Sequence, residues 1–274
     1  MGDPVNSIEV TRKLVRALHL QRLIFAGVNA YARVWPRRLC TRDGIRYQLD
    51  LTEVIDQGIW LHGWEPATIA LLKRHVAPGD TVIEVGANVG AHTLLLASLV
   101  GPAGKVYAFE PTAYAQRKLR ANIDLNPDLK GRVVLRPELV TNHAGQTPVR
   151  RIRSSFPATS DATAVELVEA AAIALDNEPL AGLNFLKIDV DGYDFKVLEG
   201  ATGLLEKFKP HVLIELCEFA LNAQGDSVRD ILGLLSSLGY RGTYESGIPI
   251  RGAEEVLARV GTTASVNAFF SRPA

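Results

Sequence analysis

The stretch Asp80–Thr93, DTVIEVGANVGAHT, constrains the fold of this chain more than any other. Its run Val82–Val85 is mainly apolar and β-branched, which is typical of a parallel strand that is covered on both faces. Gly86 and Gly90 follow, and glycine permits tight turns and close approach of the backbone to a ligand. A helix is expected over 93–100, and the free N–H groups of a first helical turn can bind a carboxylate or a phosphate. The stretch therefore predicts a buried strand, a glycine turn and a helix arranged around a ligand.

The spacing of the glycine turn indicates which ligand it fits. A dinucleotide-binding loop has the pattern G-x-G-x-x-G, whereas this turn has Asn88 where a middle glycine would be expected. Glu84 precedes the turn and brings a negative charge, which suits an ammonium or sulfonium group better than a pyrophosphate. The next predicted strand, 105–109, is followed by Glu110, and an acid at that place can accept hydrogen bonds from both hydroxyls of a ribose. These features fit S-adenosylmethionine, and the alternative is a generic strand–turn–helix with two surface acids.

The composition argues against several classes of protein. The chain has 274 residues, of which 47% are hydrophobic, enough for one large domain or one domain with an N-terminal cap. Lys+Arg and Asp+Glu both number 30, and this balance argues against a nucleic-acid-binding protein that depends on a strongly basic surface. Cys40 and Cys217 lie far apart, so they offer neither metal-ligand spacing nor a disulfide framework, and reduced thiols are expected. With no signal peptide or transmembrane-length apolar run, we expect a cytoplasmic protein.

The N-terminal part has its own pattern. Apolar residues recur at roughly helical spacing over 7–34 with basic residues between them, which predicts one or two amphipathic helices. Such a segment can form a lid or a dimerisation element, and a basic amphipathic helix can lie on an anionic membrane, but packing on the rest of the protein is commoner. A short strand is expected at 46–51 and a turn-rich connection at 51–63. We therefore divide the chain into an N-terminal helical cap, 1–63, and a cofactor-binding domain, 64–274.

Beyond the glycine turn, predicted helices and strands alternate. The further helices are expected at 113–125, 195–208 and 227–238, and the further strands at 132–136, 184–188, 211–215, 241–244 and 266–270. The segment 165–175 fits a helix or a strand. Alternation of this kind produces a doubly wound α/β sheet, and the last two strands would add an antiparallel edge. We therefore predict a mostly parallel, seven-stranded, Rossmann-like sheet with the helical cap at its N-terminal side.

Acidic residues lie at the carboxyl ends of the predicted strands of this sheet. They are Glu84, Glu110, Asp189, Asp191 and Glu215. Ligands of open α/β sheets bind outside the carboxyl ends of the strands, so we expect these carboxylates on one rim of a pocket. Glu65, which is close to the pocket in sequence, is a further candidate for a cofactor contact, and Glu138, after the third strand, is a candidate for the adenine amino group. The polar segment 154–163 is expected to be a mobile loop over the substrate.

Four motifs occur in the order EVGANVGAHT, YAFEP, ALD and KIDVDG. In this order they resemble the FkbM family of S-adenosylmethionine-dependent methyltransferases, over about residues 46–215. The resemblance implies a class I methyltransferase fold and O-methylation, often of a sugar or polyketide hydroxyl in secondary-metabolite or glycolipid assembly. It also favours an extended conformation for 165–175, because ALD matches the residues that precede the family's fourth strand. The family usually has glutamate where this chain has Asp191, so the reach of that acid is shorter here.

The residue pattern and the family resemblance together predict the cofactor contacts and the catalytic groups. The residues predicted to contact S-adenosylmethionine are Glu65, Glu84, Gly86, Ala87, Asn88, Gly90, Thr93, Glu110, Pro111, Glu138 and Asp189. Asp191 is the predicted general base or acceptor-orienting group, and Asp189 contacts the cofactor or the same hydroxyl. The alternative is that both acids only hold the turn at Gly192. His92 and His143 are alternative bases.

The same residues leave room for other functions and partners. Strand-end carboxylates could hold Mg²⁺ and polarise an acceptor hydroxyl, but no tight ligand motif is present, so we rank a metal-free site higher. The expected partner is a small glycoside, glycolipid or polyketide, without nucleic acid or a membrane span, and a homo-oligomer is an open alternative. The rival functions are a dinucleotide-dependent oxidoreductase and a non-catalytic methyltransferase-fold binding module. The missing middle glycine opposes the first, and the intact glycine turn opposes the second.

Overall fold

The structure is a computed structural model that describes residues 23–146, 150–153, 158, 165–261 and 263–273. Within the segment predicted to be amphipathic helices, residues 23–32 are helical and the part before residue 23 lies outside the described residues. The polar segment 154–163, predicted to be a loop over the substrate, lies outside them except for residue 158.

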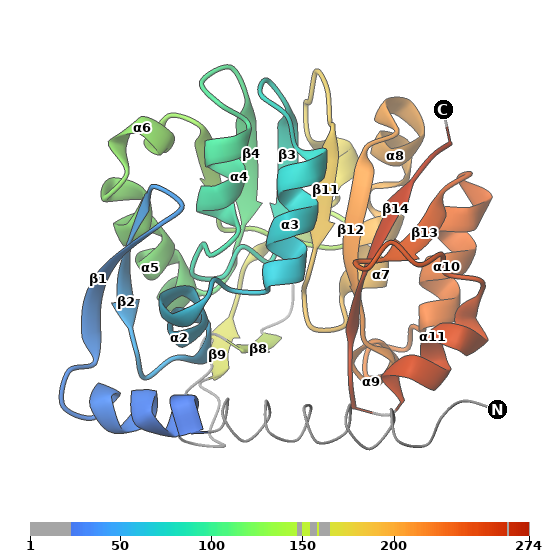
Figure 1. The fold of residues 1–274 in the computed structure, drawn as a ribbon. Helices are drawn as coiled ribbons and strands as arrows, with labels where there is room; N and C mark the ends of the chain where they lie inside the picture. Colours follow the sequence, from blue (N-terminus) through green and yellow to red (C-terminus); the bar gives the residue numbers. More distant parts are fainter. Residues whose placement is uncertain (1–22, 147–149, 154–157, 159–164, 262, 274) are drawn as a thin grey trace, which may run out of the picture.

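A seven-stranded sheet forms the centre of the protein, in the order β13-β14-β12-β11-β3-β4-β5 (Figure 1). Its strands are β3 (Thr81–Val85), β4 (Lys105–Phe109), β5 (Val133–Arg136), β11 (Phe185–Ile188), β12 (His211–Leu216), β13 (Arg241–Tyr244) and β14 (Val266–Ser271). Neighbouring strands from β5 to β12 are parallel, and β14 runs antiparallel to both β12 and β13. The predicted doubly wound, mostly parallel sheet with an antiparallel edge is confirmed.

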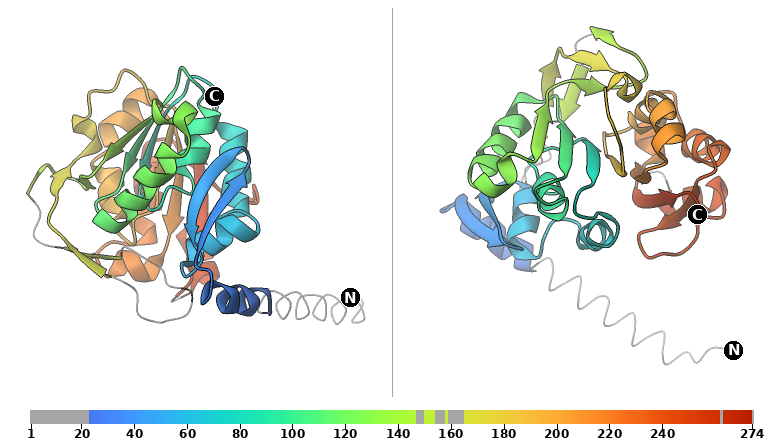
Figure 2. Two further views of the ribbon diagram at one scale, coloured as in Figure 1. Left: turned by 90° about the vertical axis from the view of Figure 1, so that its left-hand side faces the viewer. Right: turned by 90° about the horizontal axis from the view of Figure 1, so that it is seen from above.

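Helices cover both faces of the sheet (Figure 2). They are α2 (Val54–Leu61), α3 (Pro66–His75), α4 (Thr93–Leu99), α5 (Ala113–Asp124), α6 (Pro127–Lys130), α7 (Asp194–Glu199), α8 (Thr202–Phe208), α9 (Glu218–Asn222), α10 (Val228–Ser237) and α11 (Ala253–Val260). Val82 of β3 packs in one hydrophobic core, with α3 and α4, whereas Ile83 and Val85 pack in a second core, with α7, α8 and α10. This alternation is the period of two that a strand buried on both faces requires.

The region before α3 is more regular than the sequence indicated. β1 (Arg37–Arg42) pairs with β2 (Ile45–Asp50) around Asp43 and Gly44, which both have positive φ, 51° and 78°. That is the backbone of a two-residue hairpin turn, for which Asp-Gly is a favoured sequence. The prediction of a turn-rich connection over 51–63 is wrong, because α2 occupies most of this segment. The helix has only eight residues, too few for a clear helical pattern, although Ile55 and Ile59, four residues apart, are both buried in the first core.

Other elements differ in detail from the prediction. The helix expected over 195–208 is two helices, α7 and α8, and Gly200 lies between them with its α-carbon against the Thr141 carbonyl; a Cβ there would be 2.2 Å from that oxygen. The segment 165–175 is extended, as the resemblance implied, in β9 (Val165–Val168) and β10 (Ala171–Ile173). The helix α11 between β13 and β14 was not predicted.

The boundary between the predicted cap and the cofactor-binding domain stays a prediction. Side chains from both sides of residue 63 pack in the first core, among them Leu49 of β2, Ile59 of α2 and Leu94 of α4. Among the described residues, none of the helices combines the length and apolarity needed to cross a membrane.

Candidate functional site

The glycine turn after β3 is fixed to its neighbours by the backbone. Gly86 has a φ of 87°, and a Cβ on it would lie 1.9 Å from the carbonyl oxygen of Asp189. Only glycine therefore lets this turn pass against the loop that follows β11. The backbone N–H groups of Gly86 and Ala87 both donate to the carbonyl of Phe109, and that of Asn88 donates to Glu110 Oε2 at 2.9 Å. The ends of β3, β4 and β11 are thus held together as one rigid floor.

A cavity of about 310 Å³ lies at this floor. Predicted site residues that line it are Glu65, Glu84, Gly86, Ala87, Asn88, His92, Asp189 and Asp191. Five described residues other than glycine have positive φ, and three of them line this cavity: Glu65 at 50°, Asn88 at 48° and Asp191 at 49°. Such strained backbone is concentrated at functional sites, where the surrounding structure holds it in place. We call this space the glycine-turn cavity.

A buried lysine organises the charges of the glycine-turn cavity. Lys187 on β11 is the register neighbour of Glu84 on β3, and its Nζ lies 3.9 Å from Glu84 Oε1 and 3.0 Å from Asp189 Oδ2. Burial alone would lower the pKa of Lys187, but the negative charges of Asp189, Glu84 and Glu65 outweigh it and raise that pKa. The lysine is therefore a permanent cation among carboxylates. The sequence motif that contains Lys187 did not by itself indicate a role for this residue, but a lysine inside an apolar parallel strand was an available signal.

The pKa values of two buried groups beside Lys187, Glu84 and His92, are shifted. Burial raises the pKa of Glu84 to about 7, although Lys187 and a hydrogen bond of 2.6 Å from Thr93 Oγ1 counteract it. Thr93 thus supports Glu84 and does not line the cavity. Burial lowers the pKa of His92 to about 3, and the positive charge of Lys187 lowers it further. The His92 ring is therefore neutral, and its Nε2, 3.8 Å from Glu65 Oε2, has no hydrogen-bond partner among the described residues.

The turn after β11 is held by an acid that sequence reasoning did not single out. Asp194 accepts hydrogen bonds from the backbone N–H groups of Gly192 at 3.0 Å and Val190 at 3.3 Å. Burial, with the charges of Asp189 and Glu215, raises the pKa of Asp194 to about 8. Holding this turn is therefore a role of Asp194, and the carboxylates of Asp189 and Asp191 lie along the cavity.

The other predicted cofactor contacts lie outside the cavity lining. Glu110 is buried below the turn and accepts from Asn88 and from the N–H and hydroxyl of Thr112. A Cβ on Gly90 would lie 2.3 Å from Leu119 Cδ1, so this glycine allows helix packing. Glu138 pairs with Arg136, which also binds Glu178. Pro111, like these three residues, is absent from the described residues that line the cavity.

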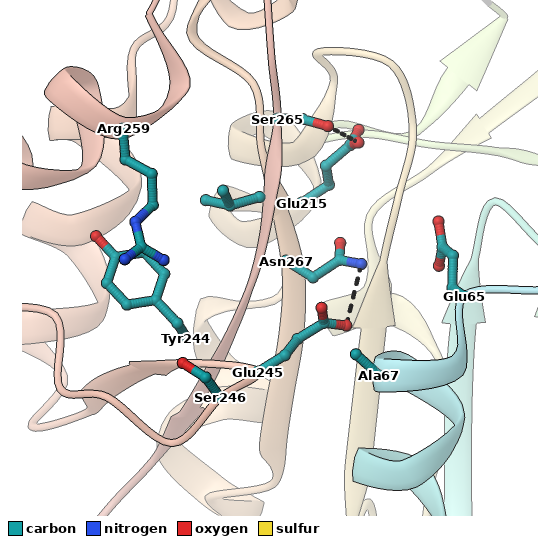
Figure 3. Close-up of a pocket in the computed structure, with 10 residues that line it drawn as sticks. Glu65, Ala67, Glu215, Tyr244, Glu245, Ser246, Arg259, Ser265 and Asn267 are labelled. Carbon is teal, nitrogen blue, oxygen red and sulfur yellow. Dashed lines mark hydrogen bonds between the residues drawn. The ribbon is translucent and has the colours of Figure 1, made fainter. Parts of the chain in front are cut away.

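A second cavity, of about 510 Å³, adjoins the first and shares Glu65 and Glu215 with it (Figure 3). We call it the β14 cavity. It is lined by the start of α3, the end of β12, β13 and its following turn, α11 and β14. Its lining side chains are mostly hydrogen-bonding groups: Glu65, Glu215, Tyr244, Glu245, Ser246, Arg259, Ser265 and Asn267.

Hydrogen bonds fix several side chains of the β14 cavity. Asn267 Nδ2 donates to Thr68 Oγ1 at 3.1 Å and to Glu245 Oε1 at 3.3 Å, and the Thr68 hydroxyl also donates to Glu245. Ser265 donates to Glu215 Oε1 at 2.6 Å (Figure 3). Burial and the charge of Asp189 raise the pKa of Glu215 to about 7. Glu245 and Asn267 belong to no motif, and sequence reasoning missed both.

The residues present fit a cationic cofactor. Carboxylates of Glu65, Glu84, Asp189 and Asp191 outnumber the single cation of Lys187 in the glycine-turn cavity, which suits a sulfonium and an ammonium group. The unpaired buried His92 Nε2 indicates a polar occupant, because buried polar atoms normally have partners. No group of three or more His, Cys, Asp or Glu side chains within the described part of the chain is arranged to hold a metal ion.

Known proteins share this sequence pattern. The family model of the methyltransferase FkbM domain matches residues 84–241, which is more than half of the chain. The chain belongs to the FkbM methyltransferase family. This FkbM protein is therefore an S-adenosylmethionine-dependent methyltransferase with a class I sheet, as its motifs implied. The match begins at Glu84 and ends in β13, so it includes the glycine turn, Glu110 and the KIDVDG run.

Individual relatives are distant. Hexuronic acid methyltransferase AglP of Haloferax volcanii is 24% identical over 177 residues, which are 63% of this chain and 68% of that protein. Among solved structures, methyltransferase FkbM from Methylobacillus flagellatus KT has a TM-score of 0.47 at 13% identity, over 79% of this chain and 59% of that one. The SAM-dependent O-methyltransferase TM0748 from Thermotoga maritima has a TM-score of 0.46 at 15% identity, over 87% of this chain and 79% of that one.

Proposed function

We propose that this FkbM protein methylates a hydroxyl of a small, hydroxyl-rich acceptor, a sugar or a glycosylated or polyketide-type compound. The observation that carries the proposal is the β14 cavity, which is lined mostly by hydrogen-bonding residues and adjoins the glycine-turn cavity at Glu65 and Glu215. Carboxylate, amide and hydroxyl side chains are the groups that bind sugar hydroxyls. The relationship to a hexuronic acid methyltransferase supports the same acceptor class.

The two cavities have separate roles in this proposal. S-adenosylmethionine supplies an electrophilic methyl group on its sulfonium, and Glu65, Glu84, Asp189 and the glycine turn would hold it. Glu110 directly follows β4, where an acid suits the ribose hydroxyls, and its buried carboxylate also supports the glycine turn by accepting the Asn88 N–H. The acceptor would enter the β14 cavity, so that its hydroxyl reaches the wall that the two cavities share. Holding the two reactants in line supplies much of the rate enhancement for a displacement of this kind.

An acceptor hydroxyl also needs a group that takes its proton. Asp191 remains the proposed base or orienting group, whereas the Asp189 carboxylate is already paired with Lys187 Nζ at 3.0 Å. The lowered pKa of His92 makes that ring a poor proton acceptor at neutral pH. Glu215 is a competitor for the role, since it lies where the cavities meet and its pKa of about 7 is close to neutral pH.

A methyl-transfer assay tests the proposed function. Labelled S-adenosylmethionine would be incubated with a panel of glycosides, polyketides and catechols, with and without EDTA. We expect label in a hydroxyl-rich acceptor, unchanged by EDTA. Loss of transfer with EDTA and its return with Mg²⁺ would assign the strand-end carboxylates to a metal. Tight cofactor binding without label in any acceptor would contradict the proposed acceptor class and favour a binding module, whereas nicotinamide binding would favour the oxidoreductase.

A further inference from the structure

Exposed apolar side chains are concentrated at the N-terminal end of the described chain. Seven large hydrophobic side chains are exposed among the described residues, and five of them lie between residues 23 and 39. These five, which we call the N-terminal strip, are Leu23, Ile24, Val34, Trp35 and Leu39. Trp35 is 56% exposed and Leu39 76%. Apolar side chains that are exposed so close together in the sequence indicate a surface that contacts a protein or a membrane.

The charge of the same stretch has one sign. Residues 23–42 contain four arginines and no Asp or Glu, in a chain whose acidic and basic residues are balanced. Arg42 donates to backbone carbonyls of α2, but Arg33, Arg37 and Arg38 have no ion pair among the described residues. Asp50, opposite Arg37 in the hairpin, is the one acid in register with these arginines. The N-terminal strip is therefore apolar surface among arginines.

The strip is held in a fixed shape. The backbone N–H groups of Val34 and Trp35 both donate to the carbonyl of Tyr31, at 3.1 and 3.0 Å. The Tyr31 ring lies 5.3 Å from the Trp35 ring and is stacked at 5.6 Å on Trp60 of α2, with the Arg38 guanidinium over it at 4.8 Å. Contacts through Tyr31 with the helical segment and α2 thus hold Trp35 in its exposed position. A surface that is ordered before binding loses less conformational entropy when it docks.

The strip also lies at a functionally relevant end of the molecule. The helical segment 23–32 lies at the end of the sheet where β3, β4, β11 and β12 finish (Figure 1). The glycine-turn and β14 cavities are built at that same end, from residues that follow those strands. A surface docked on the strip would therefore lie on the side of the molecule that holds the site.

We infer that the N-terminal strip docks this protein on an anionic lipid surface. Trp and Leu side chains enter the interface between headgroups and acyl chains, and arginines among them attract anionic headgroups. A symmetric contact between two copies would bring the unpaired arginines of both chains together, which repels. RNA would neutralise the arginines but would leave Leu39 and Val34 in water.

Vesicle co-sedimentation of the whole chain tests this inference. The vesicles would be phosphatidylcholine alone or mixed with phosphatidylglycerol. We expect binding to the anionic vesicles that weakens with salt, because headgroup attraction is screened. The variant Arg33→Gln/Arg37→Gln should bind about 25-fold more weakly, about fivefold for each arginine. The variant Trp35→Ser/Leu39→Ser should bind at least about tenfold more weakly, because the apolar contact is lost.

Matched controls are available on another part of the surface. Ile248 is 50% exposed and Arg251 is exposed, both after β13, so Ile248→Ser and Arg251→Gln change similar groups away from the strip. They should bind vesicles as the unmodified protein does, and thermal unfolding should show all variants folded. Absence of binding to anionic vesicles, or equal losses in the controls, would overturn the inference. So would strip variants that only convert a dimer to a monomer, or that only lose RNA binding. The readout involves no methyl transfer, so it is independent of the proposed acceptor.

Discussion

The two cavities of this FkbM protein adjoin each other but are built in different ways. The glycine-turn cavity is formed mainly by residues that directly follow β3 and β11, so strand and ligand group are neighbours in sequence. The β14 cavity depends on side chains that meet only after folding, such as Asn267 and Thr68, which are 199 residues apart. The first cavity therefore has a local sequence signature and the second has none. Variants of each cavity should accordingly affect different measurements.

The largest effect is expected from Gly86→Ala. The added Cβ would overlap the Asp189 carbonyl, and alanine is strained at a φ of 87°. We expect S-adenosylmethionine binding to fall more than about 100-fold and the free energy of unfolding to fall by about 3 kcal/mol or more, as for other overpacked and strained sites. Calorimetric titration and urea unfolding would measure both.

Gly79→Ala is the matched control for that variant. Gly79 has a φ of 94° but no atom within 4 Å of the Cβ position, so it carries the backbone strain without the overlap. A loss of about 1–2 kcal/mol with normal cofactor binding is expected. If the two substitutions lower stability and cofactor binding equally, backbone strain alone explains both effects. The close approach of the turns after β3 and β11 would then have no part in cofactor binding.

The next effect concerns the buried cation. Lys187→Met leaves the carboxylate of Glu84 buried without a compensating charge, which typically costs about 3–5 kcal/mol of unfolding free energy. The pKa of Glu84, already raised to about 7 by burial, would rise further without Lys187. A raised acid pKa means that stability is lost as pH increases from the unfolded value through the folded one. The loss should therefore be larger at pH 8 than at pH 5.5 in urea unfolding.

The double variant Glu84→Gln/Lys187→Met separates charge from packing. Without either charge, the loss of unfolding free energy should no longer depend on pH. Much of the stability should also return, because burying an uncharged pair costs less free energy than burying a lone ion. Glu84→Gln alone should also flatten the pH profile between about 4.5 and 7. A Lys187→Met variant as stable at pH 8 as at pH 5.5 would contradict the assigned role of Glu84.

The sequence predicted the parts of the site that depend on local geometry. The acids at the ends of β3, β4, β11 and β12 were expected on one rim because parallel strands end together. Glu84, Asp189, Asp191 and Glu215 do line the glycine-turn cavity, whereas Glu110 does not. The role of Lys187 was missed because the apolar pattern of a buried strand does not show what a charged residue inside it contacts. The side chains of β13 and β14 could not be assigned to a site from the sequence. Their contact with α3 depends on the order of strands in the sheet, which the sequence pattern does not give. The helices α2 and α11 were missed because eight residues give too short a pattern.

The wall that the two cavities share should show which acid takes the proton. If Glu215 is the base, Glu215→Gln should lower kcat by about 100-fold and abolish a rise in kcat/KM as pH increases through about 7. Asp191→Asn would then change mainly the KM for the acceptor. If Asp191 is the base, Asp191→Asn should lower kcat by about 100-fold and Glu215→Gln should change mainly the KM for the acceptor. The acceptor found in the methyl-transfer assay would serve as substrate, and cofactor binding by both variants would be measured by calorimetry as the control.

The smallest effect is expected from Glu138→Gln, which tests a residue that the sequence assigned to the cofactor. Glu138 pairs with Arg136 at 3.0 Å, and Arg136 also keeps Glu178 at 2.8 Å. Because the Glu138–Arg136 pair is partly exposed, its loss should cost less than about 1 kcal/mol of unfolding free energy. The Kd for S-adenosylmethionine should stay within about twofold, whereas Glu110→Gln, which weakens the hydrogen bonds under the glycine turn, should raise it about tenfold. A tenfold weaker Kd for Glu138→Gln would instead place the adenine beyond β5, and the cofactor would then extend past the glycine-turn cavity.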